Sequence, residues 1–85
     1  MAKGIVRYWA AAKEAAGVAE EPFDAVTLGD LVVQITSKYE NPHLARVLSR
    51  SSFLVDGAPA GTRDPHTVEL PDDATVEVLP PFAGG

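Results

Sequence analysis

The chain has 85 residues, no cysteine and a formal net charge of −5, from seven Lys+Arg against twelve Asp+Glu. This length fits one small domain, which buries about 60% of the surface that its unfolded chain exposes and has little room for an internal pocket. The missing thiols exclude disulfides and thiolate metal ligands, and the acidity argues against nucleic acid, which binds basic surfaces. We therefore expect the function to lie at a surface or a terminus. The acidity itself fits a basic protein partner or simply solubility.

The first quarter of the chain predicts a strand, a helix and a second strand. A β-prone run lies at 5–9, and the alanine-rich segment 10–16 is expected to form a helix that ends at Gly17. EEPFDA at 20–25 predicts a strand that Pro22 confines to a sheet edge or a strand start.

The clearest element is a helix that begins after Thr27. Thr27 is a candidate N-cap, and Asp30 three residues later resembles a capping box. Apolar residues then recur at the spacing of one helix face, which predicts core positions at Leu28, Leu31, Val32 and Ile35. Asn41-Pro42 is expected to end this helix, and 43–48 to form a further helical turn.

The remainder of the domain predicts mainly short strands. In chain order we expect a strand at 52–56, a loop at 58–65, a very short strand at 68–70, a turn at 71–73 and a last strand at 75–79. Val76 and Val78 share one face of the last strand. The element order predicts an α+β domain with a mixed sheet and one main helix packed across it, and the first and last strands pairing in parallel.

A short tail follows the last strand. We divide the chain into a domain at 1–79 and an extended C-terminal diglycine tail at 80–85. Pro80 and Pro81 have a fixed φ and no backbone N–H, so they end a sheet ladder and hold the chain extended.

The end of the tail is almost free of side-chain volume. Ala83, Gly84 and Gly85 can enter a narrow channel that excludes larger residues. The reactive group they deliver is the α-carboxylate of Gly85, which is a poor electrophile until it is activated, for example as an acyl-adenylate made from ATP. A sulfur or nitrogen nucleophile can then attack it, so the tail suits a substrate of another enzyme. A frayed terminus is the plain alternative.

Two stretches carry a resemblance to a known family. YWAAAKEAAG (8–17) resembles a first strand that runs into a short glycine-ended helix, and TVEVLPPFAGG (75–85) resembles a last strand with its tail. Both are similar to the MoaD-type small subunit of molybdopterin synthase, within the ubiquitin-like MoaD/ThiS sulfur-carrier family. The resemblance covers essentially the whole chain and implies a β-grasp fold.

The resemblance also implies a mechanism and its partners. An E1-like adenylating enzyme of the MoeB type uses ATP to activate Gly85, and a sulfur donor protein converts the carboxylate to a thiocarboxylate. The large synthase subunit of the MoaE type then receives the tail, and the sulfur passes to a pyranopterin precursor of the molybdenum cofactor. The chain itself is expected to bind no cofactor and to be no enzyme alone. Two small subunits are implied per large-subunit dimer, and a monomer when the partner is missing.

Several residues are implied in partner contacts. Trp9, Leu79 and Phe82 are the expected apolar anchors, with Ala60 as a weaker neighbour, while Pro80, Pro81, Ala83 and Gly84 thread into the partner. Burial of Trp9 in the core is the alternative. The lone His43 and His66 have no spaced partners, so no metal site is expected, and Asp72 and Asp73 are interpreted as turn formers.

Three alternatives remain open on the sequence. The chain is a sulfur carrier of another pathway, such as thiamine or cysteine synthesis, or a ubiquitin-like modifier joined through Gly85 to a lysine, or a binding module whose tail is inert. We expect a cytoplasmic location with no membrane contact, because no apolar run approaches the length of a membrane span and the start lacks the apolar core of a signal peptide.

Overall fold

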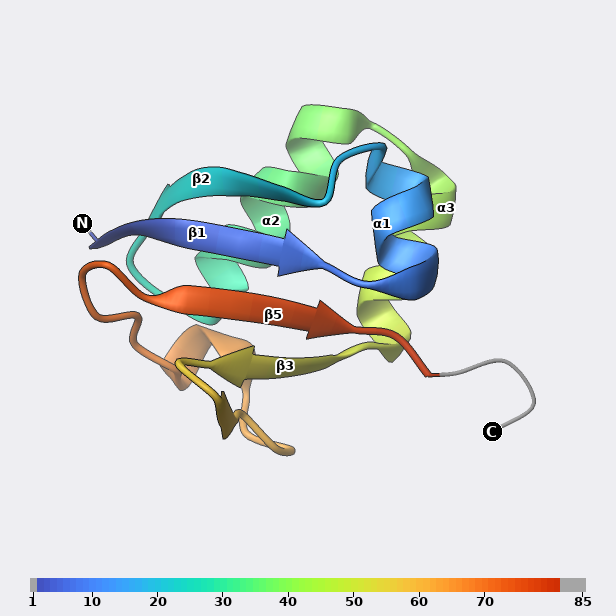
Figure 1. Ribbon diagram of the computed structural model, residues 1–85. Coiled ribbons are helices and arrows are strands. Elements are labelled where there is room, and N and C mark those ends of the chain that lie inside the picture. The colour runs from blue at the N-terminus through green and yellow to red at the C-terminus, as the bar shows by residue number, and fades with distance from the viewer. Residues whose placement is uncertain (1, 82–85) are drawn as a thin grey trace.

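A computed structural model describes residues 2–81 and shows one mixed five-stranded sheet. Its strands are β1 (Ala2–Tyr8), β2 (Glu20–Ala25), β3 (Ser52–Val55), β4 (Ala58–Pro59) and β5 (Thr75–Leu79). The strand order is β2-β1-β5-β3-β4, so β2 is an edge strand, as Pro22 predicts. β1 and β5 pair in parallel, as predicted, and the other pairs are antiparallel (Figure 1).

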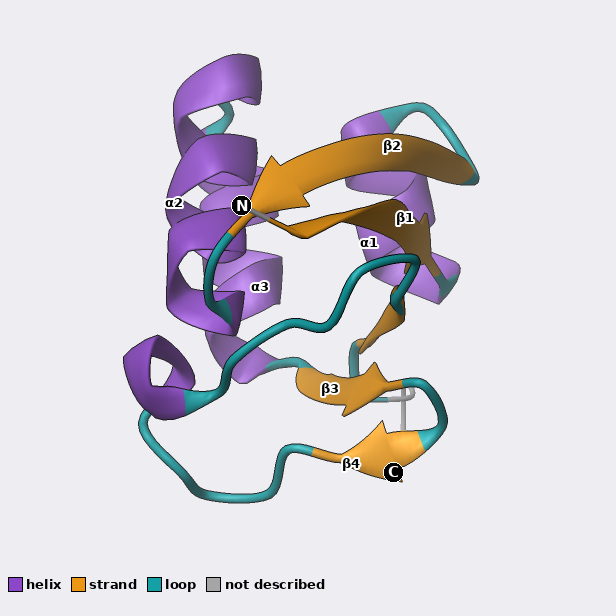
Figure 2. Ribbon diagram, turned by 90° about the vertical axis from the view of Figure 1, so that its left-hand side faces the viewer, coloured by secondary structure: helices purple, strands orange, loops and turns teal. Residues whose placement is uncertain are grey.

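The helices lie against one face of this sheet. They are α1 (Ala10–Ala16), α2 (Leu28–Tyr39) and α3 (Pro42–Arg50), followed by a short 3₁₀ helix, η1 (Pro65–Thr67). In Figure 1 the sheet faces the viewer, with α2 and α3 behind it, and Figure 2 shows the two layers from the side. Among residues 2–81, no helix is long and apolar enough to cross a membrane.

The alternation of apolar and polar side chains along the central strands explains why the helices cover only one face of the sheet. Val6 and Tyr8 of β1 lie in register with Val76 and Val78 of β5, and all four side chains are buried against the helices. Arg7 points to the opposite, open face and is exposed. Every second side chain of these strands therefore points into the core, which lies on the side of the sheet that the helices cover.

The main helix forms as its sequence predicts, with one difference. The Thr27 hydroxyl accepts a hydrogen bond from the backbone N–H of Asp30 at 3.1 Å, which caps the helix. Leu28, Leu31 and Ile35 are buried, whereas Val32 is only half-buried, at the margin of the same stripe. The helix ends at Tyr39, just before the predicted Asn41-Pro42 stop.

The segment after β3 differs from its prediction. The expected loop at 58–65 contains β4, which pairs with β3 over only two residues, too few for a periodic signal. The expected strand at 68–70 is a single bridge between Glu69 and Thr27. Val68 and Leu70 are buried on either side of it, a strand-like pattern, yet their backbones bond to the segment before α2 instead of joining the sheet.

Candidate functional site: the end of the central strand

The site is built around the end of β5, the strand from which the predicted tail continues. β5 lies between β1 and β3. β1 pairs with it as far as Val78, and Ser52 of β3 pairs with Leu79, so the strand is held on both sides up to Val78 and by β3 at its last residue. Pro80 is buried and Pro81 is exposed. The predicted tail residues Phe82, Ala83, Gly84 and Gly85 lie outside the described residues. The described chain therefore reaches the surface at Pro81, beside a rigid strand end.

Trp9 lies at this same end of the molecule. It follows the last residue of β1 and its backbone N–H donates to the carbonyl of Val78 at 3.2 Å. Its side chain is 46% exposed, whereas that of Tyr8 is 2% exposed, so the alternative of a buried Trp9 is wrong. Because β1 and β5 are parallel and in register, the structure brings Trp9 next to Leu79, which is half-buried.

The backbone turns sharply as the chain passes from β1 to α1. Ala10, the residue after Trp9, has a φ of 48°, and Gly17, the C-cap of α1, has a φ of 80°. A positive φ is unfavourable for alanine, so the surrounding structure must hold this turn in place. The turn ends β1 at Tyr8 and directs the Trp9 side chain away from the core.

Ala60 is a correction to the predicted interface. Its side chain is 5% exposed and belongs to the hydrophobic core. The reason is the β3–β4 hairpin, in which the backbone N–H of Ala60 donates to the carbonyl of Phe53 at 2.9 Å and folds the following chain back under the sheet. Ala60 therefore presents no side-chain surface to a partner in the isolated chain.

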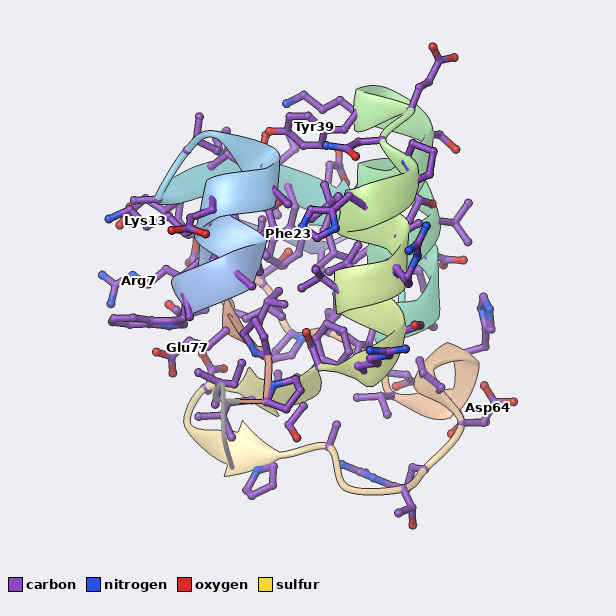
Figure 3. All side chains as sticks on the ribbon, turned by 90° about the vertical axis from the view of Figure 1, so that its right-hand side faces the viewer. Arg7, Lys13, Phe23, Tyr39, Asp64 and Glu77 are labelled. Atoms are coloured by element: carbon purple, nitrogen blue, oxygen red, sulfur yellow. The ribbon has the colours of Figure 1, made fainter. Side chains whose placement is uncertain are left out.

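Charged side chains flank the strand ends on the open face. Arg7 pairs with Glu20 across β1 and β2, with 3.4 Å between Nε and Oε1, and Glu77 lies opposite Arg7 on β5. Figure 3 looks onto this end of the molecule and shows Arg7, Lys13 and Glu77 on one side of it. Within residues 2–81 no group of three His, Asp or Glu side chains is placed to hold a metal. This end of the molecule therefore presents exposed charged groups together with the exposed Trp9.

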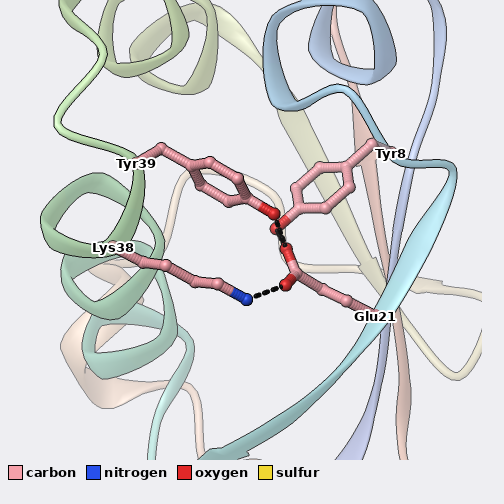
Figure 4. Close-up of polar contacts among 4 residues, drawn as sticks. All are labelled: Tyr8, Glu21, Lys38 and Tyr39. Atoms are coloured by element: carbon pink, nitrogen blue, oxygen red, sulfur yellow. Dashed lines mark hydrogen bonds and ion pairs between the residues drawn. The ribbon is translucent and has the colours of Figure 1, made fainter.

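A second polar feature, missed by the sequence analysis, lies beneath the α1 turn. Glu21 of β2 accepts hydrogen bonds from the hydroxyls of Tyr8 and Tyr39, both at 2.7 Å, and forms an ion pair with Lys38 (Figure 4). The cluster ties the end of α2 to β1 and β2. The sequence contains a signal for this cluster, because Glu21 lies on the same face of β2 as the core residues Phe23 and Ala25 and so points inward, where a carboxylate needs partners.

The environment of this cluster shifts three pKa values. Burial acts to raise the pKa of Glu21, but the hydrogen bonds from Lys38, Tyr8 and Tyr39, with the charge of Lys38, outweigh it and lower that pKa. Burial, followed by the hydrogen bond and the charge of Glu21, raises the pKa of Tyr39 to about 12 and that of Tyr8 further. The two phenols therefore stay protonated donors to a charged carboxylate.

Comparison with known proteins gives both a family and a fold. The sequence model of one family, described as the ThiS family, matches residues 6–85. No curated protein matches the chain.

Among solved structures, small archaeal modifier protein 1 from Methanosarcina acetivorans is 26% identical, with a TM-score of 0.83, and the match covers 100% of this chain and 98% of that one. A putative molybdopterin converting factor subunit 1 from Pyrococcus furiosus is 24% identical, with a TM-score of 0.78 over 96% and 100% of the two chains.

A complex of subunits 1 and 2 of molybdopterin-converting factor from Helicobacter pylori contributes a more distant match. It is 20% identical, with a TM-score of 0.66 over 98% of this chain and 99% of that one. At this identity the likeness shows the fold alone. The matches agree with the sheet order and helix placement described above and confirm the predicted α+β, ubiquitin-like β-grasp fold.

Proposed function

This chain belongs to the ThiS family, the MoaD and ThiS type of ubiquitin-like sulfur carrier, and within it we propose the small subunit of a molybdopterin synthase. The observation that carries the proposal is the strand end. β5 is held between two neighbours up to Val78 and by β3 at Leu79, the chain surfaces at Pro81, and the sequence continues as FAGG. A rigid base with a slender extension suits delivery of a carboxylate into a partner's active site.

The proposed chemistry begins with activation by an E1-like adenylating enzyme. An oxygen of the Gly85 carboxylate attacks the α-phosphorus of ATP, and pyrophosphate leaves, which gives the acyl-adenylate. A sulfur nucleophile from a donor protein attacks the acyl carbon, and AMP leaves. With a persulfide donor the product is an acyl disulfide. A second thiol then attacks the donor's sulfur and breaks the S–S bond, which leaves the donor and the second thiol joined as a disulfide and releases a thiocarboxylate in which sulfur has replaced one oxygen. ATP and the catalytic side chains belong to the partner enzymes.

In the next step the thiocarboxylate is the sulfur donor. The large synthase subunit holds the tail, and the thiocarboxylate sulfur attacks a carbon of the pyranopterin precursor and displaces an oxygen leaving group. Water then hydrolyses the resulting thioester, which leaves the sulfur on the precursor and the Gly85 carboxylate free for another cycle. Trp9 and Leu79 flank the base of the tail and serve as apolar contacts for the partner, because exposed aromatic side chains commonly anchor such interfaces. We place these events in the cytoplasm.

The molybdopterin assignment is supported by the PPFAGG ending, the YWAAAKEAAG motif and the fold of two molybdopterin converting factor subunits. A second candidate is a protein modifier. The small archaeal modifier protein 1 of Methanosarcina acetivorans shares 26% of its sequence with this chain over the whole length. The sulfur carrier and the protein modifier both need an activated Gly85. They differ in the nucleophile that attacks it, which is sulfur for the carrier and a lysine amine for the modifier.

One reconstitution separates these candidates. The chain, prepared as its Gly85 thiocarboxylate, is mixed with a molybdopterin synthase large subunit and the pyranopterin precursor, with the carboxylate form and a chain lacking Gly85 as controls. We expect dithiolene formation from the thiocarboxylate alone. In a parallel incubation of the carboxylate form with an E1-like adenylating enzyme, ATP and lysine-bearing proteins, conjugates on a denaturing gel, together with no dithiolene product in the first mixture, would instead assign the chain as a modifier. Sulfur transfer only to a thiamine or cysteine precursor would move it to another pathway.

A further inference from the structure

A groove of about 360 Å³ runs between β2 and α2, on the opposite side of β1 from the strand that leads into the tail. Its floor is apolar and is formed by Phe23, Leu31 and Ile35. Its rim carries Lys3 and Lys38 together with Asp24. The volume lies within the range of ligand sites, and the mixture of an apolar floor with a few polar groups is typical of them. None of these residues takes part in the proposed sulfur chemistry.

The backbone of β2 contributes hydrogen-bonding groups to this groove. The N–H of Tyr8 donates to the carbonyl of Ala19 at 2.8 Å, so the alternation of an antiparallel ladder turns the backbone groups of residues 20, 22 and 24 toward the free edge. The side chain of Gln34 covers the carbonyl of Asp24 at 2.8 Å. Pro22 has no N–H to offer. The N–H groups of Glu20 and Asp24 and the carbonyls of Glu20 and Pro22 remain available to an added strand.

The groove has a lysine near each end and, among the described residues, one unpaired acceptor, Asp24, so it can pair both with acidic groups and with an N–H donor of a ligand. The carboxylate of Glu21 is already occupied by two phenols and Lys38. Lys38 remains largely exposed beyond that ion pair, and Lys3 is exposed at the other end of the groove. Oδ1 of Asp24 is buried and accepts no hydrogen bond from the described residues. Such an oxygen is costly to leave unpaired, so a donor from a ligand would stabilise it.

We propose that the β2–α2 groove binds an extended peptide segment of a partner protein, which adds to the sheet beside β2. Its backbone bonds the free groups of Glu20, Pro22 and Asp24, and alternate apolar side chains pack on the floor. Carboxylates flanking the apolar residues pair with Lys3 and Lys38. Because β1 separates β2 from β5, a partner can hold the carrier here without covering the base of the tail.

Pro22 makes this edge selective. A strand added to β2 finds a carbonyl but no N–H at the middle of the edge, so pairing between copies of the chain is disfavoured. A peptide with apolar and acidic side chains loses one backbone hydrogen bond at Pro22, and its side-chain contacts in the groove compensate for that loss. The inference rests on the groove and does not depend on the fate of Gly85.

The test begins with selection of a random peptide display library on the full chain. Peptides that bind are expected to alternate β-branched or aromatic residues and to carry Asp or Glu at their ends. Lys3→Glu and Lys38→Gln are expected to weaken their binding about tenfold or more, because complementary charge is removed from the interface. Lys13→Glu, the matched change on the exposed α1 surface, is expected to leave binding unchanged.

Two further measurements distinguish strand addition from a general surface contact. N-methylation of the peptide amides that face β2 abolishes binding, while methylation of the alternate amides has no effect. Pro22→Ala restores an N–H at the free edge and tightens binding several-fold. Amide shifts in the NMR spectrum are expected at Glu20, Glu21, Phe23 and Asp24. The proposal is overturned if no selected peptide distinguishes the wild type from Lys3→Glu, or if both N-methylated series bind alike.

Discussion

Tyr8 and Trp9 are adjacent in the sequence and have opposite surroundings. Tyr8 ends β1 on its inward face and its hydroxyl reaches Glu21, whereas Trp9 leaves the strand and lies on the surface beside the end of β5. Burying a tryptophan contributes several kcal/mol when a partner supplies the apolar surface. The residue order Tyr-Trp therefore places one aromatic ring in the core and the next on the surface, where we propose that it contacts the partner.

Replacement of Trp9 separates these two roles. Trp9→Ser is expected to leave the free energy of unfolding within about 0.5 kcal/mol of the wild type, as is usual at exposed positions. It is expected to weaken binding to the large synthase subunit at least tenfold, as for an aromatic anchor. Urea unfolding and calorimetric titration measure the two effects. Val33→Ser, at a side chain that is 53% exposed on α2, is the control that changes neither. A large loss of stability with unchanged binding would contradict this role for Trp9.

Gly4 is required because two other segments of the same chain lie very close to its Cα. A Cβ at this position would lie 2.8 Å from the Phe23 ring and would collide with the backbone carbonyl of Ala74. Since that carbonyl accepts the N–H of Ile5 at 3.0 Å, it has little freedom to move. Gly4→Ala is therefore expected to cost about 1–3 kcal/mol or more, as overpacked sites do, in urea unfolding.

Gly29 on α2 is the control position for Gly4. A Cβ there meets only the imidazole of His66, an exposed side chain that can rotate away. Alanine also gains about 1 kcal/mol of helix propensity over glycine. Gly29→Ala is expected to be close to neutral, and an equal cost at both glycines would refute the distinction between backbone and side-chain contacts.

Glu21 makes stability depend on pH. Because its folded-state pKa lies below the ordinary value of 4.5, its stabilisation is complete above about that pH and is lost as the pH falls through the folded-state pKa. The side chain is 12% exposed, so solvent screens these bonds little. Glu21→Gln is expected to lower the free energy of unfolding by roughly 1–3 kcal/mol near neutral pH.

The difference between the wild type and Glu21→Gln should shrink in acid. Urea unfolding at about pH 7 and about pH 3 measures it, and Tyr39→Phe, which removes a single hydroxyl, is expected to show a smaller loss at neutral pH. A difference that stays constant over this range would mean that the Glu21 carboxylate is not the group responsible.

At the scale of elements, α3 depends on one side chain at its start. Oδ1 of Asn41 accepts the N–H groups of His43 and Leu44 at 3.0 and 3.3 Å, and its Nδ2 donates to the carbonyl of Ala15 at 3.2 Å. Asn41 thus caps α3 and joins it to α1. Asn41→Ala is expected to cost about 1–2 kcal/mol, the usual loss of a cap.

Asn41→Asp divides this contribution into its two parts. Aspartate keeps the cap but loses the donor to Ala15, so its stability in urea unfolding is expected to fall between those of the wild type and Asn41→Ala. If Asn41→Asp proves as unstable as Asn41→Ala, the cap is not the main contribution.

Elements with a local cause were predictable from the sequence. The Thr27 cap, the glycine stop at Gly17 and the alternation of Val76 and Val78 each depend on neighbours within a few residues, and each is confirmed. β4 and the bridge at Glu69 depend on partners distant in sequence, and they were missed or misassigned. Propensity carries no information about such pairing.

The features of the candidate site also fall into those that the sequence predicts and those that it does not. The strand end followed from the sequence pattern, and the exposure of Trp9 agrees with the surface position that the family resemblance implies. The burial of Ala60 and the cluster around Glu21 required the tertiary structure, because both arise from contacts between separate elements. The β2–α2 groove likewise arises from how two elements pack and from no motif.

For the molecule as a whole, the strand order separates two surfaces. β5, with Trp9 and Leu79 at its end, holds the base of the tail at the centre of the sheet, and β2 presents the groove at one edge. A net charge of −5 is compatible with contacts to basic protein partners. The proposed function therefore depends on whether the C-terminal carboxylate of the chain carries sulfur.

The most direct measurement is the intact mass of the purified chain after incubation with an E1-like adenylating enzyme, ATP and a sulfur donor. We predict a shift equal to the replacement of one oxygen by sulfur, dependent on ATP and absent when Gly85 is deleted. Circular dichroism of the deleted chain checks that the domain stays folded. A chain that keeps its unmodified mass with an activating enzyme competent on other ThiS-family carriers would contradict the central claim.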